Sequence, residues 1–316
     1  DSKRYYPYST LAANVLGFVG TDNSGLYGLE AKYDSVLQGT SGLTVTAKNA
    51  AGTDLLYQYE QYYDAKNGDS LVLTLDTNIQ YYLEKGIESM VDKFNAKNGG
   101  TGIVMDVNTG AILAMASYPT FDLNSPSAIY DGALSGSLKG KDQNSDDYKE
   151  ALAAARLKQW RNKCINDTYE PGSTFKPVTL ATALETGAVN MNTTFYCSGS
   201  IRVQGWGKPI SCSKKTGHGS QSLMVATGNS CNPAFITMGL KIGTSDYYKY
   251  LRSFGLMEIT GIDTIGESTG IFADEKSFNS NVVSLASYAF GQTFTVTPLQ
   301  LIRAQAATVN GGYLYT

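Results

Sequence analysis

Residues 169–177 read YEPGSTFKP, and this stretch decides the fold prediction. Its Pro-Gly pair is typical of a turn, and the apolar pattern that follows predicts a helix from Ser173 towards Glu185. Residues three apart share one face of a helix, which places Lys176 one turn above Ser173. The sequence therefore predicts a hydroxyl and an amine side by side at the start of a helix.

This pair has a chemical use. A serine hydroxyl is a poor nucleophile until a base removes its proton, and a lysine can be that base when burial or neighbouring cations lower its pKa. The positive end of the helix dipole favours an oxyanion that forms beside the serine. The alternative is an ordinary helix start with a solvated lysine. The bare S-x-x-K pattern is weak, because Ser211-Cys212-Ser213-Lys214 also matches it.

Regular structure is predicted upstream of this stretch. Residues 70–75 (SLVLTL) alternate as in a strand, and Asp76 or Thr77 can cap a helix after it. The buried face of that helix is expected to consist of Ile79, Leu83, Ile87, Met90, Val91 and Phe94, with Gly99-Gly100 ending it. Residues 101–107 and 111–117 then predict two strands joined by a hairpin turn.

Composition excludes some classes of function. The 316 residues carry a formal net charge of −3 without a basic stripe, which argues against a nucleic-acid-binding protein. No apolar run approaches the roughly 18 residues that a membrane span needs. The chain opens on Asp1 rather than Met, so we expect a piece of a longer protein whose membrane anchor is not in this chain.

Residues 170–177 resemble the nucleophile motif of the class B penicillin-binding proteins, which carry E-P-G-S-T-F-K-P there. The family places S-x-N some fifty to sixty residues later, and Ser230-Cys231-Asn232 begins 57 residues after Ser173. The resemblance implies that Lys176 is the general base, that Ser230 relays a proton and that Asn232 binds the substrate amide. A second S-x-N match, at residues 277–279, lacks the following proline and the helical approach that residues 223–228 provide.

The third family motif, K-T-G, is expected beyond Thr316. Lys215-Thr216-Gly217 spells it but precedes Ser230, in a loop rather than on an edge strand, and is interpreted as a chance match. Residues 288–300 resemble the segment just upstream of the true motif, and Gly291, Gln292 and Thr293 are the predicted substrate-binding residues. The family usually has glycine at the position of Thr293.

The resemblance covers nearly the whole chain. It implies an α/β (α+β) penicillin-binding transpeptidase fold, with an antiparallel sheet flanked by helices, at residues 70–316. Residues 1–69 resemble the C-terminal part of the family's elongated, non-catalytic pedestal. The division and sporulation branch is the most similar, because of residues 217–221 (GHGSQ) and 230–233 (SCNP).

Three cysteines and the only histidine fall within 35 residues: Cys197, Cys212, His218 and Cys231. Three thiolates and an imidazole are a known structural zinc set, and the intervening segment is polar and glycine-rich. Zinc, a disulfide such as Cys197–Cys212, and unlinked cysteines all stay open, and Cys164 could replace one ligand. His218 is a poor base for a Ser-His-Asp triad, because no carboxylate lies near it in the sequence.

The predicted function is a serine D,D-transpeptidase that cross-links peptidoglycan stem peptides through an acyl-enzyme and is acylated by β-lactams. The chemistry needs no cofactor, and the N–H of Ser173 would be one oxyanion donor. A cell-wall glycosyltransferase is the expected partner, and the extracytoplasmic face of the bacterial membrane the expected location. The alternatives are a penicillin-binding scaffold or β-lactam sensor and, with less support, a β-lactamase, for which no E-x-x-x-N follows Ser230.

Overall fold

The computed structural model describes residues 3–45 and 61–316, which form two compact units. The first unit comprises Asp1–Gly100, Tyr118–Arg161 and Asp263–Ile265, and the second comprises Thr101–Ser117, Asn162–Ile262 and Gly266–Thr316. Residues 46–60 of the predicted pedestal lie outside the described residues. The first unit continues past residue 69, and the boundary between residues 69 and 70 stays a prediction.

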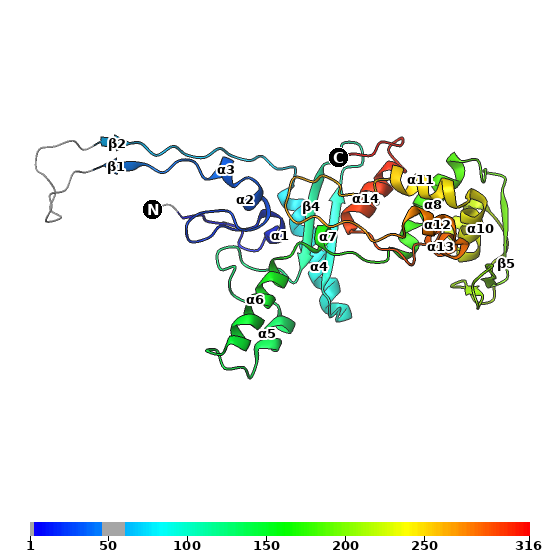
Figure 1. Cartoon of the computed structure of the whole chain (residues 1–316), viewed down its shortest axis with the longest axis horizontal. Coiled ribbons are helices and arrows are strands. Elements are labelled where there is room, and N and C mark those ends of the chain that lie inside the picture. The colour runs from blue at the N-terminus through cyan, green and yellow to red at the C-terminus, as the bar shows by residue number, and fades with distance from the viewer. Residues whose placement is uncertain (1–2, 46–60) are drawn as a thin grey trace, which may run out of the picture. The chain divides into compact units, whose positions relative to one another are not determined.

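The first unit contains short helices, one ribbon and two longer helices (Figure 1). In chain order these are α1 (Ala13–Leu16), α2 (Gly28–Lys32), α3 (Asp34–Leu37), β1 (Leu43–Val45), β2 (Gln61–Tyr63), α4 (Thr77–Phe94), α5 (Gly132–Leu138) and α6 (Asp146–Trp160). β1 and β2 pair antiparallel, with Leu43 opposite Tyr63.

An aromatic cluster fills the core of the first unit. The Phe18 and Trp160 ring centroids lie 4.9 Å apart, and Tyr27 lies 4.9 Å from Trp160. Phe121 meets Phe18 edge to face at 6.1 Å. These rings join segments more than one hundred residues apart, so they hold α6 to the N-terminal helices.

Helix α4 follows the prediction at its start and departs from it at its end. Asp76 caps it by accepting hydrogen bonds from the N–H groups of Asn78 and Ile79. The helix ends at Phe94, because Asn95 takes a left-handed conformation (φ 47°) that stops it before Gly99. The predicted apolar face was wrong at its last positions, since Met90 and Phe94 are 53% and 69% exposed.

The strand predicted at residues 70–75 was wrong. These residues belong to none of the sheets in the described part of the chain, and Val72 is 98% exposed. Alternation of apolar residues makes a strand only where a neighbouring strand takes up its backbone hydrogen bonds.

The second unit opens with the predicted hairpin. Strands β3 (Gly100–Met105) and β4 (Ile112–Tyr118) pair with each other, although their outermost residues belong to the first unit. The N–H groups of Thr109 and Gly110 donate to the Asp106 carbonyl, and Gly110 has a φ of +77°, which a tight turn requires.

Helices and small ribbons make up the rest of the second unit. The elements are α7 (Lys163–Asn166), η1 (Gly172–Phe175), α8 (Lys176–Glu185), β5 (Thr194–Cys197), β6 (Ser200–Ile201), β7 (Ile210–Ser211), β8 (Gly219–Ser222), α9 (Leu223–Gly228), α10 (Asn232–Ile242), α11 (Thr244–Ser253), α12 (Glu275–Asn279), α13 (Val282–Tyr288) and α14 (Pro298–Ala307).

Helix α10 is the centre of the second unit's core and packs against both α8 and α13 (Figure 1). Phe235, Ile236 and Met238 on this helix are fully buried. A helix that is apolar on most sides is stable only when neighbours cover it, so α10 fixes the positions of the elements around it. Across the described residues, no helix is long and apolar enough to cross a membrane.

Candidate active site

The turn before α8 carries the predicted nucleophile. Ser173 is exposed and lies in the 3₁₀ turn η1, and the α-helix begins only at Lys176. Pro177 has no N–H to donate to the Ser173 carbonyl, so the Lys176 N–H donates to it instead. Side chains three apart share one face of a 3₁₀ turn, so the spacing of Ser173 and Lys176 favours one face for both, although the α-helix starts three residues later than expected.

The Lys176 ammonium lies at the junction of the two predicted motifs. The side chain is only 3% exposed. Its Nζ donates three hydrogen bonds, to the Ser230 carbonyl (2.7 Å), the Ser230 Oγ (2.9 Å) and the Asn232 Oδ1 (2.7 Å). An ammonium has three N–H donors, so this set of acceptors satisfies all of them. Lys176, Ser230 and Asn232 are therefore brought together.

Two opposing effects set the charge of this lysine. Burial lowers the pKa of Lys176 to about 8, and ionisation of the neighbouring Cys212 and Cys231 thiols would oppose that change. Nζ also lies 5.2 Å from the centre of the Phe235 ring. A lysine with a pKa near 8 is partly neutral at physiological pH and can accept a proton.

The turn that carries Ser230 connects α9 to α10. Ser230 takes a left-handed conformation (φ 47°), and its N–H donates to the Thr227 carbonyl at 2.9 Å. This conformation ends α9 and turns both the carbonyl and the hydroxyl of Ser230 towards Lys176. The Asn232 Nδ2 donates to the Ser211 carbonyl at 3.1 Å, which leaves Oδ1 for the lysine.

Residues 291–296 run beside the nucleophile turn. The Gly172 N–H donates to the Gly291 carbonyl at 2.8 Å, and the Thr293 N–H donates to the Glu170 Oε1 at 2.9 Å. A side chain at Gly291 would lie 2.0 Å from the Gly172 oxygen, so only glycine permits this approach. The predicted substrate-binding residues Gly291 and Thr293 thus lie next to the nucleophile turn, and their contact with substrate stays a prediction, as does that of exposed Gln292.

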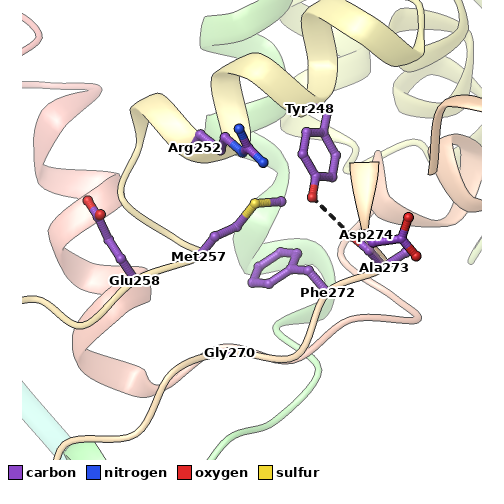
Figure 2. Close-up of a pocket in the computed structure, with 8 residues that line it drawn as sticks. All are labelled: Tyr248, Arg252, Met257, Glu258, Gly270, Phe272, Ala273 and Asp274. Carbon is purple, nitrogen blue, oxygen red and sulfur yellow. Dashed lines mark hydrogen bonds between the residues drawn. The ribbon is translucent and has the colours of Figure 1, made fainter. Parts of the chain in front are cut away.

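Aromatic packing supports the same turn from within. The Phe175 and Phe294 rings meet at 4.8 Å, and both side chains are at most 2% exposed. Phe272 stacks on Phe294 at 5.0 Å and also lines a surface cavity of about 470 Å³ (Figure 2). Figure 2 shows Phe272 beside Met257, with Tyr248 and Arg252 above them. This cavity adjoins the aromatic packing and lacks the serine and lysine of the motif.

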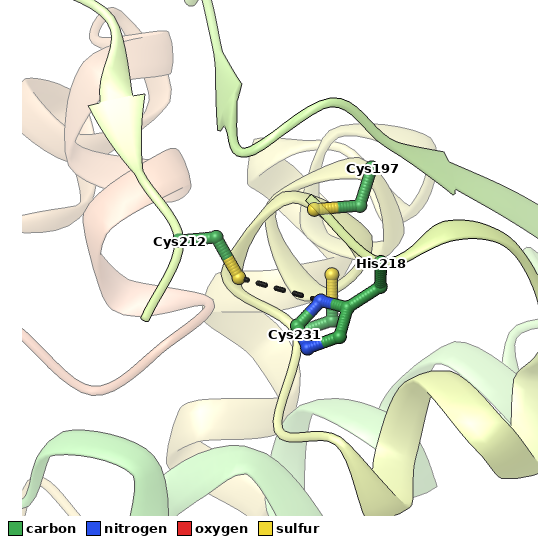
Figure 3. A group of neighbouring side chains, drawn as sticks. All are labelled: Cys197, Cys212, His218 and Cys231. Carbon is green, nitrogen blue, oxygen red and sulfur yellow. Dashed lines mark hydrogen bonds between the residues drawn. The ribbon is translucent and has the colours of Figure 1, made fainter. Parts of the chain in front are cut away.

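The predicted metal-ligating residues form one cluster. The sulfur atoms of Cys197, Cys212 and Cys231 and a ring nitrogen of His218 all lie within 4.8 Å of one another, and Figure 3 shows them converging on a common point. The three thiols are buried, and the Cys212 sulfur lies 3.7 Å from the His218 Nδ1. A tetrahedral zinc site with Zn–S bonds of about 2.3 Å has edges of about 3.8 Å, so the cluster has the size that zinc needs.

Two small ribbons and one helix end assemble this cluster. Cys197 ends β5 opposite Gly219 of β8, which places it beside His218. The Cys212 N–H donates to the Gly199 carbonyl just after the β6–β7 ribbon. Cys231 is the N-cap residue of α10, so it lies directly between Ser230 and Asn232.

Cys164 is not an alternative ligand, and that prediction was wrong. Its thiol donates to the Ala116 carbonyl at 3.3 Å and to the Gly102 carbonyl at 3.6 Å, within the β3–β4 region. Burial raises its pKa to about 12. All four cysteines are free thiols in the structure, so the disulfide alternative, such as Cys197–Cys212, is not seen among the described residues.

Some contacts at the site were not predicted from the sequence. Glu170 belongs to the family motif, which assigns it no contact, and its carboxylate accepts a hydrogen bond from the Thr293 N–H. Gln221 accepts a hydrogen bond from the Asn229 side chain at 2.8 Å, just before Ser230. The first contact joins residues that are 123 positions apart, and the second joins residues on either side of helix α9. A single sequence reveals neither. The chance match at residues 215–217 lies in a turn, as expected.

Known proteins resemble this chain over nearly its whole length. Residues 100–316 match the penicillin binding protein transpeptidase domain, and residues 1–73 match the penicillin-binding protein dimerisation domain. Stage V sporulation protein D of Bacillus subtilis is 37% identical over all of this chain and 44% of its own length. Peptidoglycan D,D-transpeptidase FtsI of Escherichia coli K12 is 28% identical over 97% of this chain and 46% of its own length.

Solved structures give the same fold. Penicillin binding protein 3 of Mycobacterium tuberculosis superposes with a TM-score of 0.74 at 28% identity, over 98% of this chain and 59% of that protein, and it has also been solved with aztreonam and with ampicillin. The chain spans less than half the length of the curated relatives that it matches. The predicted mixed α/β transpeptidase fold is therefore confirmed, and the chain belongs to the class B penicillin-binding proteins.

Proposed function

We propose that this chain carries the acylation centre of a serine D,D-transpeptidase that cross-links peptidoglycan. The observation that supports this most is the Lys176 ammonium, which is buried, hydrogen-bonded to Ser230 and Asn232, and one 3₁₀ turn from exposed Ser173. Residues 70–316 are proposed as the transpeptidase domain, and residues 1–69 as the end of the pedestal.

The chemistry begins with neutral Lys176. It takes the proton of the Ser173 hydroxyl while Oγ attacks the penultimate D-Ala carbonyl of a stem peptide. The N–H of Ser173 donates to the oxyanion. When the peptide C–N bond breaks, Ser230 passes the proton from Lys176 to the departing D-Ala amine. An amine of a neighbouring stem peptide then attacks the ester carbon, and as the new C–N bond forms and the C–O bond breaks, Lys176 moves a proton from the amine to the Ser173 Oγ, which restores the free hydroxyl.

Each residue has a property suited to its step. Lys176 has its pKa lowered by burial, which gives a base close to working pH. The Ser230 hydroxyl lies 2.9 Å from Nζ, within reach for proton transfer. The Asn232 amide is held in one orientation by Ser211 and Lys176, and it is proposed to bind the substrate amide. Gly291, Gln292 and Thr293 are proposed to flank the bound peptide.

Mass spectrometry of the full-length protein with and without a penicillin tests the proposal. We expect a stable adduct that peptide mapping locates on Ser173, and none in the Ser173→Ala variant. Rapid loss of the adduct with penicillin hydrolysis would favour a β-lactamase. A stable adduct without turnover of stem peptides would favour a β-lactam sensor or scaffold. An adduct on another residue would contradict the assignment.

A structural zinc ion is proposed at Cys197, Cys212, His218 and Cys231. The support is the size of the cluster, its donor set and the burial of its three thiols. Because Cys231 separates Ser230 from Asn232, metal binding there would fix the turn that holds Lys176, and metal loss would disorder it. The ion takes no part in the acyl transfer. Elemental analysis of protein purified without chelators should give one zinc per chain, and the absence of zinc would contradict this.

The cellular setting follows from the relatives. We propose that the whole protein acts on the extracytoplasmic face of the bacterial membrane, through an anchor outside this chain, with a cell-wall glycosyltransferase as partner. Support comes from the relatives named for sporulation and for D,D-transpeptidation. A Helicobacter pylori penicillin-binding protein with the same fold (TM-score 0.71, 30% identity) has been solved in complex with MreC.

A further inference from the structure

Thr293 has a backbone conformation that does not suit its side chain. Its φ is +69°, in the left-handed region. Threonine is β-branched, and such residues are rarely found there because the side chain crowds the backbone. A residue persists in this conformation only when its surroundings hold it.

Two hydrogen bonds hold Thr293. Its N–H donates to the Glu170 Oε1 at 2.9 Å, and its hydroxyl lies 2.5 Å from the Ser287 Oγ. The next side chain, Phe294, is 2% exposed and fixed by its packing on Phe175. The strained residue therefore lies between a carboxylate from the nucleophile turn and a buried aromatic anchor.

The same contacts fix the nucleophile turn itself. Glu170 lies three residues before Ser173, and the Tyr169 and Val296 backbones exchange two hydrogen bonds of 3.0 Å. Three residues after Tyr169, the Gly172 N–H donates to the Gly291 carbonyl. The Glu170–Thr293 bond lies between these two backbone contacts and is the one that a side chain supplies.

We propose that Glu170 is a positioning residue for Ser173. Its carboxylate keeps Thr293 left-handed, which keeps residues 291–296 against Gly172 and so fixes the direction of the Ser173 hydroxyl and N–H. Loss of the carboxylate lets Thr293 relax to a conformation with negative φ, and the Gly172–Gly291 contact then shifts. This inference rests on the proposed function, because it is read out through acylation of Ser173.

Acylation kinetics of the full-length protein with a fluorescent penicillin test it, with penicillin binding and the acylation rate constant measured separately. We expect Glu170→Ala to lower the acylation rate constant about tenfold, as for the loss of one hydrogen bond to a charged group, with little change in penicillin binding. Glu170→Gln keeps an acceptor oxygen and is expected to recover most of that rate.

A double-mutant cycle separates positioning from general damage. Glycine adopts a positive φ without strain, so in a Thr293→Gly background the same Glu170→Ala change should cost less than about threefold. An equal loss in both backgrounds, or no loss with threonine present, would overturn the inference. If the unchanged protein is not acylated at all, the proposed function fails instead, which keeps the two failures distinct.

Discussion

Two turns meet at the Lys176 ammonium, and they are stabilised in different ways. The nucleophile turn rests on buried aromatic rings, Phe175 and Phe294, and on backbone bonds to residues 291–296. The Ser230 turn adjoins a polar, glycine-rich segment, and its Cys231 lies close to Cys197, Cys212 and His218 of that segment. Both turns border one buried apolar core, which includes Phe175, Phe294 and Cys231, so the difference between them is the Cys/His cluster that adjoins only the Ser230 turn.

The largest effect should come from removing the group that both turns share. Lys176→Met keeps the length of the side chain but removes the base and all three hydrogen bonds to Ser230 and Asn232. We expect the acylation rate to fall about a thousandfold, within the range for loss of a general base. Stopped-flow measurement with a reporter penicillin checks this, and a loss of less than about tenfold would separate Lys176 from the chemistry.

The pH dependence of acylation should follow the same lysine. Burial lowers the Lys176 pKa to about 8, and only the neutral amine accepts the Ser173 proton. The rate should therefore rise about tenfold per pH unit below 8 and level off above it. A rate profile from pH 5.5 to 9.5 measures this. A flat profile, or a rate that still rises about tenfold per pH unit up to pH 9.5, would show that burial does not lower the pKa of the catalytic lysine.

Cys231→Ala should disturb the Ser230 turn selectively. We expect loss of bound zinc and a decrease of about 3–5 kcal/mol in the free energy of unfolding, as for loss of a structural metal. Denaturant unfolding and elemental analysis measure the two effects. Cys164→Ala is the matched control, because that buried thiol lies outside the cluster, and it should keep its zinc. Equal zinc contents in Cys231→Ala and Cys164→Ala would contradict the proposal that Cys231 binds zinc beside the Ser230 turn.

Phe294→Leu should weaken the nucleophile turn and leave zinc content unchanged. Loss of its ring contacts with Phe175 and Phe272 should lower the free energy of unfolding by about 1–2 kcal/mol. Phe94→Leu, at a position that is 69% exposed, is the control and should change it by less than about 0.5 kcal/mol. Loss of zinc in Phe294→Leu would mean that zinc binding beside the Ser230 turn depends on the aromatic packing beneath the nucleophile turn.

The smallest change concerns an ion pair at the surface. Arg252 and Glu275 lie 3.2 Å apart and are 60% and 52% exposed. Glu275→Ala should alter the free energy of unfolding by less than about 0.5 kcal/mol, because solvent screens exposed pairs. Thermal unfolding of Glu275→Ala is compared with that of Phe294→Leu, which is expected to be the less stable of the two. A larger loss of stability in Glu275→Ala than in Phe294→Leu would show that the ion pair between α11 and α12 supports the core.

Local patterns were predicted from the sequence, and distant contacts were not. Three predicted features depend only on neighbours in the chain, and the structure contains them. They are the turn that carries Ser173 just before Lys176, the β3–β4 hairpin and the Asp76 cap. The Cys/His cluster was one of the alternatives that residue types and their closeness in the sequence left open. The strand at residues 70–75 failed because strand formation depends on a partner that the sequence of the segment does not specify.

The remaining features needed three dimensions. The Thr293 conformation and its bond to Glu170 join positions 123 residues apart. The exclusion of Cys164 from the cluster depended on the β3–β4 carbonyls that accept its thiol. Neither follows from spacing, because both arise from how separate segments pack.

Turnover of a stem peptide tests the central claim most directly. The full-length protein would be given a synthetic stem peptide that ends in D-Ala-D-Ala together with an acceptor amine, and both released D-Ala and joined product would be quantified. The account predicts one D-Ala released per joined product, an acyl-enzyme on Ser173 in quenched samples, and neither product in the Ser173→Ala variant. Stable penicillin binding with no D-Ala release, or equal release from Ser173→Ala, would contradict it.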